Sequence, residues 1–337
     1  MATSETLHRI NRLVRGQRIK FGAALLADIA RIRHTIVRVD PVGACNLRCG
    51  MCFFSSATWR TEHAKGRLTK SELERIASML FPLAIQVHFG ASMEPTTFKD
   101  YPWLVRLAKQ HKVPFVGFTT NAQLLTSDGI RQLAAAGLDE ITISSHGVHK
   151  DTYERLMRGA SFEKHHETLR DLASVRSLNK LPRLRINFTI NPDNLEELKS
   201  FFDVYGAYNL TTLQLRPVFD FADTEYRNND LSKYLDRYRA ITADIIREGA
   251  NRRVHVLANV SDPTHEGGNV FAHVYRTAFL RAVSPEFVWT KDFDWRNESL
   301  ADYCNRIGWR KMLLRQIIQP HRQASLPAAQ TAAFDVF

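Results

Sequence analysis

Cysteine is scarce in this 337-residue chain, which contains four, and the sequence has no internal repeat or low-complexity tract. So few thiols make a poor disulfide framework, and a composition of 44% apolar and 24% charged residues is typical of a globular protein. The N-terminus lacks the basic, apolar and small-residue order of a signal peptide. Its longest early apolar run, FGAALLADIA, is too short to cross a bilayer. The sequence therefore predicts a soluble, cytoplasmic protein without a membrane span.

Acidic residues are in deficit, because 35 Asp and Glu stand against 46 Lys and Arg, for a net charge of +11. This balance favours an anionic partner, which could be a phosphate-bearing substrate, nucleic acid or a membrane surface, but it is equally typical of a solvated basic surface. Arg9, Arg12, Arg15 and Arg18 form one basic stripe in the segment 1–34. We expect this segment to be a helix packed on the rest of the fold, and the question of nucleic acid stays open.

Short β-rich runs alternate with helical patterns over residues 35–260, which is typical of βα units and a parallel α/β sheet. The expected strands are TIVRV, IQVHF, FVGFT, EITIS, LRINFTI, TTLQLR and VHVLA. A capping box of Thr69 and Glu72 marks the start of one helix, and Gly137 marks the end of another. The period is lost near residue 260, so residues 261–337 are predicted to form an irregular C-terminal extension.

Three of the four cysteines, Cys45, Cys49 and Cys52, lie within eight positions on a loop after the first expected strand. Thiolates at CxxxCxxC spacing can converge on one centre, and two kinds of centre compete. Structural zinc needs four closed ligands, and the fourth would have to come from Cys304, His63 or another distant residue. A 4Fe-4S cluster on three cysteines leaves one iron open, as catalysis requires. The spacing favours the cluster.

The loop VGACNLRCGMCFF and its position after the first strand resemble the radical S-adenosylmethionine (SAM) superfamily, over roughly residues 35–260. The resemblance implies a partial (β/α)6 TIM-like barrel. It implies that the three cysteines bind three irons of one 4Fe-4S cluster, while the amino and carboxylate groups of SAM chelate the fourth. In this family, reductive cleavage of SAM yields a 5'-deoxyadenosyl radical that abstracts a substrate hydrogen. A low-potential electron donor of the flavodoxin or ferredoxin type is the implied partner.

Two further motifs resemble turns of the family that bind SAM. FGASMEP, with Gly90 and Glu94, is similar to a lengthened GGEP turn, whose carbonyl oxygens receive the SAM amino group, and glycine allows a close approach there. TTNAQLL places Asn121 in the family's TNG turn, with Ala122 where glycine is usual. The alternative for Glu94 and Asn121 is that they only satisfy backbone groups of their turns.

The second half of the expected barrel carries weaker resemblances. ITISSHGVHKDTYERLMRG resembles the fourth strand and following helix of members with SPASM or twitch extensions. The match implies that Ser144 faces the ribose and Arg158 the SAM carboxylate, with Arg155 as its substitute, although Arg158 could instead form a surface ion pair. LQLRP implies that Arg216 lies near SAM. Met51 stands where an aromatic residue usually packs on the adenine, and its thioether can still contact the purine.

The C-terminal segment departs most from the family. DYCNRIGWRKMLLRQ resembles the beginning of a SPASM or twitch extension, with Cys304 and Trp309, but no cysteine follows. One thiol cannot hold an auxiliary cluster, so we expect a degenerate extension and a single cluster. If the end is intact, the aromatic segment EFVWTKDFDW is expected to cover the open side of the barrel.

The leading interpretation is a radical SAM enzyme that acts on a small molecule, such as an anionic sugar or nucleotide derivative, with catalytic residues unknown. Residues 1–34 are shorter than the leader-binding domain that peptide-modifying relatives often carry, which favours the small substrate. A radical SAM enzyme that modifies a peptide is the alternative. A third class is a non-catalytic zinc or electron-transfer module.

Overall fold

The computed structural model describes residues 16–179, 181–218, 224–226, 231–258, 274–290 and 292–319. Its centre is a parallel sheet with the strand order β7-β6-β5-β4-β3-β2-β1-β8. The strands are β1 (Thr35–Val39), β2 (Ala84–Phe89), β3 (Phe115–Thr120), β4 (Glu140–Ser144), β5 (Arg183–Ile190), β6 (Thr212–Pro217), β7 (His255–Leu257) and β8 (Leu280–Val283).

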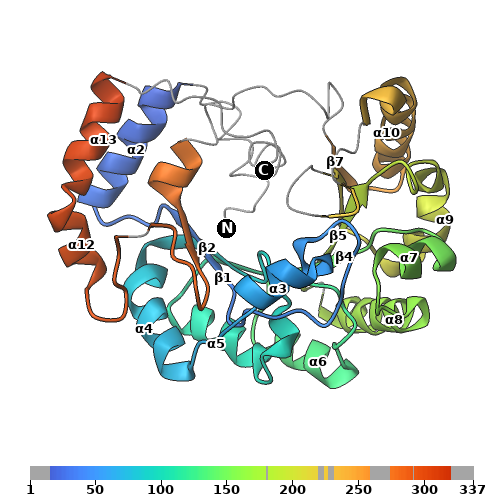
Figure 1. The fold of residues 1–337 in the computed structure, drawn as a ribbon, viewed down its shortest axis with the longest axis horizontal. Coiled ribbons are helices and arrows are strands. Elements are labelled where there is room, and N and C mark those ends of the chain that lie inside the picture. The colour runs from blue at the N-terminus through green and yellow to red at the C-terminus, as the bar shows by residue number, and fades with distance from the viewer. Residues whose placement is uncertain are drawn as a thin grey trace.

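Helices follow the outer side of this curved sheet from α2 and α13 through α4 to α10 (Figure 1). The α-helices are α2 (Gln17–Ile29), α3 (Ala57–His63), α4 (Lys70–Leu80), α5 (Tyr101–Gln110), α6 (Ser127–Ala135), α7 (Lys150–Leu156), α8 (Phe162–Asn179), α9 (Phe201–Tyr205), α10 (Leu235–Asn251), α12 (Leu300–Arg306) and α13 (Trp309–Ile318). Short 3₁₀ helices are η1 (Phe53–Ser55), η2 (Phe81–Leu83), η3 (Pro95–Thr97), η4 (Glu196–Ser200), η5 (Gly206–Tyr208) and η6 (Leu231–Tyr234), and η7 (Tyr275–Phe279) is a π-helix.

The main core lies between the sheet and these helices. Alternate strand residues such as Val37, Val87 and Phe118 are fully buried against helical residues such as Ile76 and Leu104. Buried and partly buried residues alternate in β1 and β5, so these strands keep a period of two although the sheet is parallel. The expected α/β fold of an open, TIM-like barrel is confirmed.

Local signals in the sequence correctly predicted the start of one helix and the end of another. Thr69 caps α4, since its hydroxyl accepts the Glu72 N–H at 3.2 Å while the Glu72 carboxylate accepts the Thr69 N–H at 2.9 Å. Gly137 follows α6 with a φ of +88°, in the left-handed region that favours glycine.

The described part of the C-terminal segment is more regular than the sequence indicated. β8 adds to the free edge of β1 in parallel, so the sheet has a strand beyond the predicted set. α12 and α13 follow, and α13 packs on α2 through Trp309, Leu313, Phe21 and Ala24 (Figure 1). The expected irregular extension is therefore wrong for these residues. Their helices are short and interrupted at Gly308, so no long period shows in the sequence.

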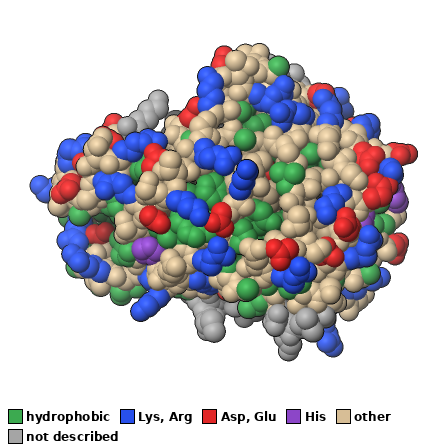
Figure 2. Space-filling model, turned by 90° about the horizontal axis from the view of Figure 1, so that it is seen from below, with side chains coloured by type: hydrophobic (Ala, Val, Ile, Leu, Met, Phe, Trp, Pro, Cys, Tyr) green, Lys and Arg blue, Asp and Glu red, His purple; other side chains and the backbone are tan. Residues whose placement is uncertain are grey.

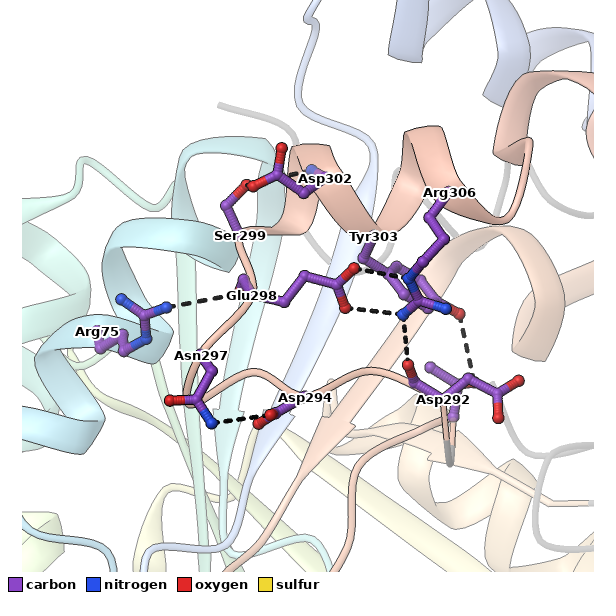
Figure 3. Close-up of polar contacts among 10 residues, drawn as sticks. Arg75, Asp292, Asp294, Asn297, Glu298, Ser299, Asp302, Tyr303 and Arg306 are labelled. Carbon is purple, nitrogen blue, oxygen red and sulfur yellow. Dashed lines mark hydrogen bonds and ion pairs between the residues drawn. The ribbon is translucent and has the colours of Figure 1, made fainter.

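The link between β8 and α12 is attached to the outer side of the fold at α4. Arg75 donates a hydrogen bond of 2.9 Å to the carbonyl oxygen of Trp295. It donates another, of 3.4 Å, to the carbonyl oxygen of Glu298 (Figure 3). The carboxylate of Glu298 accepts two bonds of 2.8 Å from Arg306, which fixes α12 to this link (Figure 3). The described part of EFVWTKDFDW joins the main core with Trp295 rather than covering the inward face of the sheet.

The basic stripe of the N-terminus falls mostly outside the described residues, which include Arg18 but not Arg9, Arg12 or Arg15. Arg18 lies on α2 and donates to the carbonyl oxygen of Ile318 at 3.5 Å, consistent with a packed helix. On the face below the view of Figure 1, Lys and Arg side chains are interspersed with Asp and Glu (Figure 2). Among the described helices, none combines the length and the hydropathy needed to cross a membrane.

Candidate active site

The loops that follow β1, β2 and β3 meet at the carboxyl ends of the parallel strands, where barrels of this kind place their active sites. The cysteine loop follows β1, the turn of residues 90–95 follows β2, and Asn121 follows β3. The first two loops touch directly, because the N–H of Glu94 donates to the carbonyl oxygen of Ala44 at 3.0 Å. These motifs were expected at the strand ends from their positions in the sequence and from their resemblance to family turns.

The cysteine loop is held by backbone bonds to the end of α7. The N–H of Gly50 donates to the carbonyl oxygen of Leu156, and the N–H of Arg48 donates to the carbonyl oxygen of Arg158, each at 3.0 Å. Within the loop, the N–H of Leu47 points at the sulfur of Cys45 at 3.4 Å. The thiols are thus placed by a loop that is fixed at both β1 and α7.

Burial makes the three free thiols hard to ionise on their own. It raises the pKa of Cys45 to about 12 and raises the pKa of Cys49 and of Cys52. For Cys49, the negative charges that Cys52 and Cys45 would carry raise the pKa further. Bound iron removes this penalty, since a coordinating thiol is deprotonated outright. Three mutually close, half-buried thiols fit the donor set of one 4Fe-4S cluster.

A single metal ion would need its ligands closer together than a 4Fe-4S cluster does. Within the described ranges, no three His, Cys, Asp or Glu side chains converge as ligands of a single ion. A cubane bound by three cysteines needs one thiolate for each of three irons, which is a wider spacing. His63, an alternative zinc ligand, is exposed beside Glu62. Cys304 lies between the two apolar clusters around α12 and α13, where burial raises its pKa to about 11.

The turn after β2 depends on glycine and on a buried carboxylate. Gly90 has a φ of +80°, and a Cβ there would overlap the carbonyl oxygen of Thr119. The Glu94 carboxylate is buried and accepts bonds from the Thr96 hydroxyl at 2.5 Å, the Thr120 hydroxyl at 2.6 Å and the Asn121 N–H at 2.8 Å. Burial raises the pKa of Glu94, which these bonds oppose. Glu94 therefore joins the ends of β2 and β3.

Asn121 connects that junction to the first cysteine. Its side-chain nitrogen lies 3.7 Å from the sulfur of Cys45 and donates to Oδ1 of Asn46 at 2.8 Å. Ala122, in the position where the related motif has glycine, keeps a left-handed φ of +68°. The departure in sequence has therefore left the shape of the turn intact.

Asp40 is a buried residue of this site that sequence reasoning missed. Its carboxylate accepts backbone N–H groups of Ala91 at 2.8 Å, Ser92 at 3.1 Å and Met93 at 3.3 Å. Burial raises the pKa of Asp40 to about 6, against the opposing effects of these amides and of the Arg38 charge. An acidic residue directly after a strand at the active-site edge was the available signal.

Ser144 and Arg158 lie at different places around the loop. Ser144 ends β4 on the inward side, next to Asn187 of β5, whose buried Oδ1 has no hydrogen-bond partner among the described residues. Arg158 lies beside Gly50 of the cysteine loop and forms an ion pair with Glu225. Neither Asn187 nor Glu225 was predicted, because their partners are distant in sequence.

Two other residues that were predicted to contact SAM, Arg155 and Met51, contact protein groups in this structure. Arg155 pairs with Asp193 at 3.1 Å, which also accepts a bond from Tyr226 at 2.6 Å. Met51 is buried in an apolar cluster with Leu156 and Val218. Met51 thus lies next to the end of α7, as Arg158 does.

Cationic residues gather on the inward face of the sheet. Arg38, Arg185 and Arg216 come from β1, β5 and β6, and Arg185 pairs with Glu140 at 2.9 Å. Burial, with repulsion from Arg38 and Arg185, lowers the pKa of Arg216 to about 10. Arg216 therefore lies near the positive charges of Arg38 and Arg185, at the carboxyl end of β6.

His88 on β2 and His146 after β4 are partly buried histidines with a lowered pKa. Burial, followed by the charges of the three arginines, lowers the pKa of His88 to about 3, and its Nε2 lies 2.6 Å from the Thr119 hydroxyl. Burial lowers the pKa of His146 to about 4, and its Nδ1 accepts the N–H of Thr189 at 3.2 Å. Both side chains are thus held by hydrogen bonds within the protein.

The comparisons with known proteins agree with this site. The sequence profile of the Radical SAM superfamily matches residues 39–205. The chain carries a radical SAM domain and belongs to this superfamily of enzymes, which use a 4Fe-4S cluster and SAM. The matched range contains the three cysteines, Asp40 and Asn121, but not Arg216.

Curated relatives match about half of the chain. A probable GTP 3',8-cyclase of Saccharolobus solfataricus is 28% identical over 185 residues, which are 54% of this chain and 57% of the relative. The GTP 3',8-cyclase of Peptoclostridium acidaminophilum is 31% identical over 179 residues, which are 52% of this chain and 53% of the relative. The chain thus matches little more than half the length of these relatives.

Among solved structures, SuiB of Streptococcus suis bound to S-adenosylmethionine is similar to this chain with a TM-score of 0.61 at 15% identity. The match covers 87% of this chain and 68% of that chain. At this identity the likeness shows the fold alone.

Proposed function

We propose that this protein is a radical SAM enzyme with one 4Fe-4S cluster on Cys45, Cys49 and Cys52, and that it abstracts hydrogen from an anionic small molecule. The observation that carries the proposal is the meeting of the three thiols with the turn 90–95 and Asn121 at one end of the barrel. The bound cluster and SAM would supply a 5'-deoxyadenosyl radical. The residues described below would bind SAM, orient it and hold the thiols.

Each predicted SAM contact has a place in this proposal. Backbone carbonyl groups after Gly90 would accept the SAM amino group, and Glu94 and Asn121 would hold that turn against the cluster loop. Arg158 would release Glu225 and bind the SAM carboxylate in its place. The Arg158 and Glu225 side chains are both partly exposed, so their ion pair is weak.

The remaining contacts concern the nucleoside half of SAM. Ser144 would face the ribose together with Asn187, whose buried Oδ1 can accept a hydrogen bond from a hydroxyl group. Met51 would contact the adenine from its apolar cluster. Arg216 would lie at the boundary between SAM and substrate.

An anionic substrate is supported by the arginines of the inward face. Three guanidinium groups gather there on β1, β5 and β6, and burial, with repulsion from Arg38 and Arg185, lowers the pKa of Arg216 to about 10. A phosphate or carboxylate group would relieve that repulsion. The names of the curated relatives refer to GTP, a nucleotide, which agrees with this class of substrate.

A peptide substrate is the competing possibility within the same chemistry. SuiB has also been crystallised with its precursor peptide SuiA, and that structure has a TM-score of 0.59 to this chain at 15% identity. We favour the small molecule because the arginine cluster belongs to this chain, whereas the likeness to SuiB concerns the fold. The electron would come from a low-potential flavodoxin or ferredoxin.

The proposal is tested by anaerobic reconstitution of the full chain with iron and sulfide, followed by reduction with dithionite. We expect wild type to convert SAM to 5'-deoxyadenosine and methionine, and Cys45→Ala to produce neither, by mass spectrometry. GTP, other nucleotides, sugar phosphates and short peptides are then added in turn. Faster 5'-deoxyadenosine formation with a phosphorylated compound would support the substrate class, stimulation by peptides alone would favour the alternative, and no cleavage would overturn the function.

A further inference from the structure

Asp40 forms an unusual link between the cysteine loop and the turn after β2. It directly follows β1, its side chain is 7% exposed, and its Oδ1 accepts the N–H of Ala91 at 2.8 Å and of Met93 at 3.3 Å. The N–H of Ser92 donates to both carboxylate oxygens, at 3.3 Å and 3.1 Å. Three successive amides thus converge on one side chain.

This convergence determines where the carbonyl groups of the turn point. In a trans peptide unit, the N–H and the C=O lie in one plane and point in opposite directions. The three amides that point at Asp40 belong to the peptide units whose carbonyl groups are those of Gly90, Ala91 and Ser92. Those three oxygens are therefore directed away from the carboxylate, as a set of acceptors suited to a cation with several N–H donors.

We propose that Asp40 is a positioning residue for SAM, whose amino group would be received by the carbonyl oxygens of Gly90, Ala91 and Ser92. The inference rests on the proposed function, because it assumes that SAM binds at this turn. Asp40 would not touch SAM itself. Its carboxylate would hold the turn in shape before SAM arrives, which lowers the entropy that binding has to remove.

The contacts of Asp40 with the turn distinguish a positioning role from a purely stabilising one. A buried carboxylate that only stabilised the fold would be replaceable by any group that satisfied the same amides. The ionised carboxylate accepts from the turn through both of its oxygens, whereas an asparagine side chain would place an NH₂ group, itself a donor, against the N–H of Ser92. The field around Asp40 comes from these amides of the turn and from Arg38 on β1.

The test compares Asp40→Asn with Asp40→Glu and with Asp139→Asn as a matched control. Asp139 also accepts a backbone N–H, from Val116 at 2.7 Å, but it lies at the opposite ends of the strands, before β4. In the reconstituted protein we expect Asp40→Asn to raise the Kd for SAM about tenfold, which is about 1.4 kcal/mol. Iron content should not change. Asp40→Glu should recover part of the affinity, and Asp139→Asn should leave the Kd unaltered.

Two further readouts do not depend on activity. In the cluster-free protein, hydrogen exchange at the amides of Ala91, Ser92 and Met93 should be slow in wild type and faster in Asp40→Asn. In the reconstituted wild type, the Kd for SAM should rise as the pH falls through about 6, the pKa to which burial raises Asp40. This wild-type measurement remains valid if Asp40→Asn fails to fold.

The outcomes separate the inference from the proposed function. If wild type binds SAM but Asp40→Asn binds it equally well while its turn amides exchange faster, Asp40 does not position SAM. A Kd for wild type that stays flat between pH 5 and pH 7, an interval around the pKa of about 6, would overturn the inference in the same way. If wild type neither binds nor cleaves SAM, the proposed function itself fails.

Discussion

The side-chain nitrogen of Asn121 lies 3.7 Å from the sulfur of Cys45, although 76 positions separate the two residues in the chain. The same nitrogen donates to Asn46 at 2.8 Å, and the backbone N–H of Asn121 donates to the buried carboxylate of Glu94. One asparagine therefore connects the cysteine loop to the turn that follows β2. This network explains how three loops from separate strands form one site.

Loss of the Asn121 amide should weaken the cluster. We expect Asn121→Ala to lower iron affinity by about 10- to 100-fold, as is typical when a group that supports a metal ligand is removed. The reduction potential should become more negative, because hydrogen bonds to the sulfurs favour the reduced cluster. Chelator competition and redox titration measure the two effects. Gln132→Ala, an exposed amide on α6, is the control, and equal behaviour of the two variants would contradict the role of Asn121.

Arg158 and Glu225 should affect SAM in opposite directions. Arg158→Ala should raise the KM for SAM by roughly 10- to 100-fold without loss of iron, because a charge-assisted bond to a carboxylate contributes about 1.5 to 3 kcal/mol. Glu225→Gln should lower the KM, since Glu225 competes for the same guanidinium. Steady-state formation of 5'-deoxyadenosine measures both. Unchanged kinetics in Arg158→Ala would leave Arg158 with a surface ion pair only.

The sequence was sufficient for strands β1 to β7, for the cysteine loop and for the turns after β2 and β3. Their signals are local, since strand runs, the CxxxCxxC spacing and turn residues such as Gly90 all lie within a few positions. Ala122 shows the limit of a letter-by-letter comparison, because it keeps the left-handed φ of +68° expected of glycine. The turn is therefore better predicted from its neighbours than from that one residue.

The missed features depend on contacts between distant segments. Asp40 binds amides 51 to 53 positions away, and Glu225 reaches Arg158 from beyond β6. β8 has only four residues and forms a strand because it pairs with the free edge of β1. Such choices are made by tertiary packing, which outweighs local propensity in short elements.

Asp40 should also make stability depend on pH. Burial raises its pKa from 3.8 to about 6, so the folded state holds this proton more tightly than the unfolded chain does. Its contribution to the free energy of unfolding is therefore present below about pH 4 and is lost as the pH rises through about 6. A shift of about two units corresponds to about 3 kcal/mol.

We expect Asp40→Asn to remove this decline, because asparagine does not titrate. Urea unfolding of the cluster-free protein, at intervals from pH 4 to pH 7 around the pKa of about 6, measures it. Wild type and variant are compared by the slope of the free energy of unfolding against pH, not by its absolute value. Parallel curves for wild type and variant would show that Asp40 is not a buried, titrating carboxylate.

The C-terminal helix should be part of the folded unit. Trp309 is 7% exposed and packs with Phe21 of α2, while the guanidinium of Arg281 lies over its ring. Trp309→Ala should cost about 3 to 5 kcal/mol. Leu314→Ala, on the same helix at 47% exposure, should change stability by less than about 0.5 kcal/mol. Denaturant unfolding of both decides, and a small effect of Trp309→Ala would mean that α13 packs loosely.

The iron content and spin-resonance spectrum of the anaerobically reconstituted protein test the central claim most directly. We expect about four irons per chain, a reduced-cluster signal that changes when SAM is added, and loss of both in Cys45→Ala, Cys49→Ala and Cys52→Ala. About eight irons would reveal a second cluster and ligands that were missed. Bound zinc in place of iron, or a cluster signal that SAM leaves unchanged, would contradict the claim that these three thiols hold a cluster with one iron open to SAM.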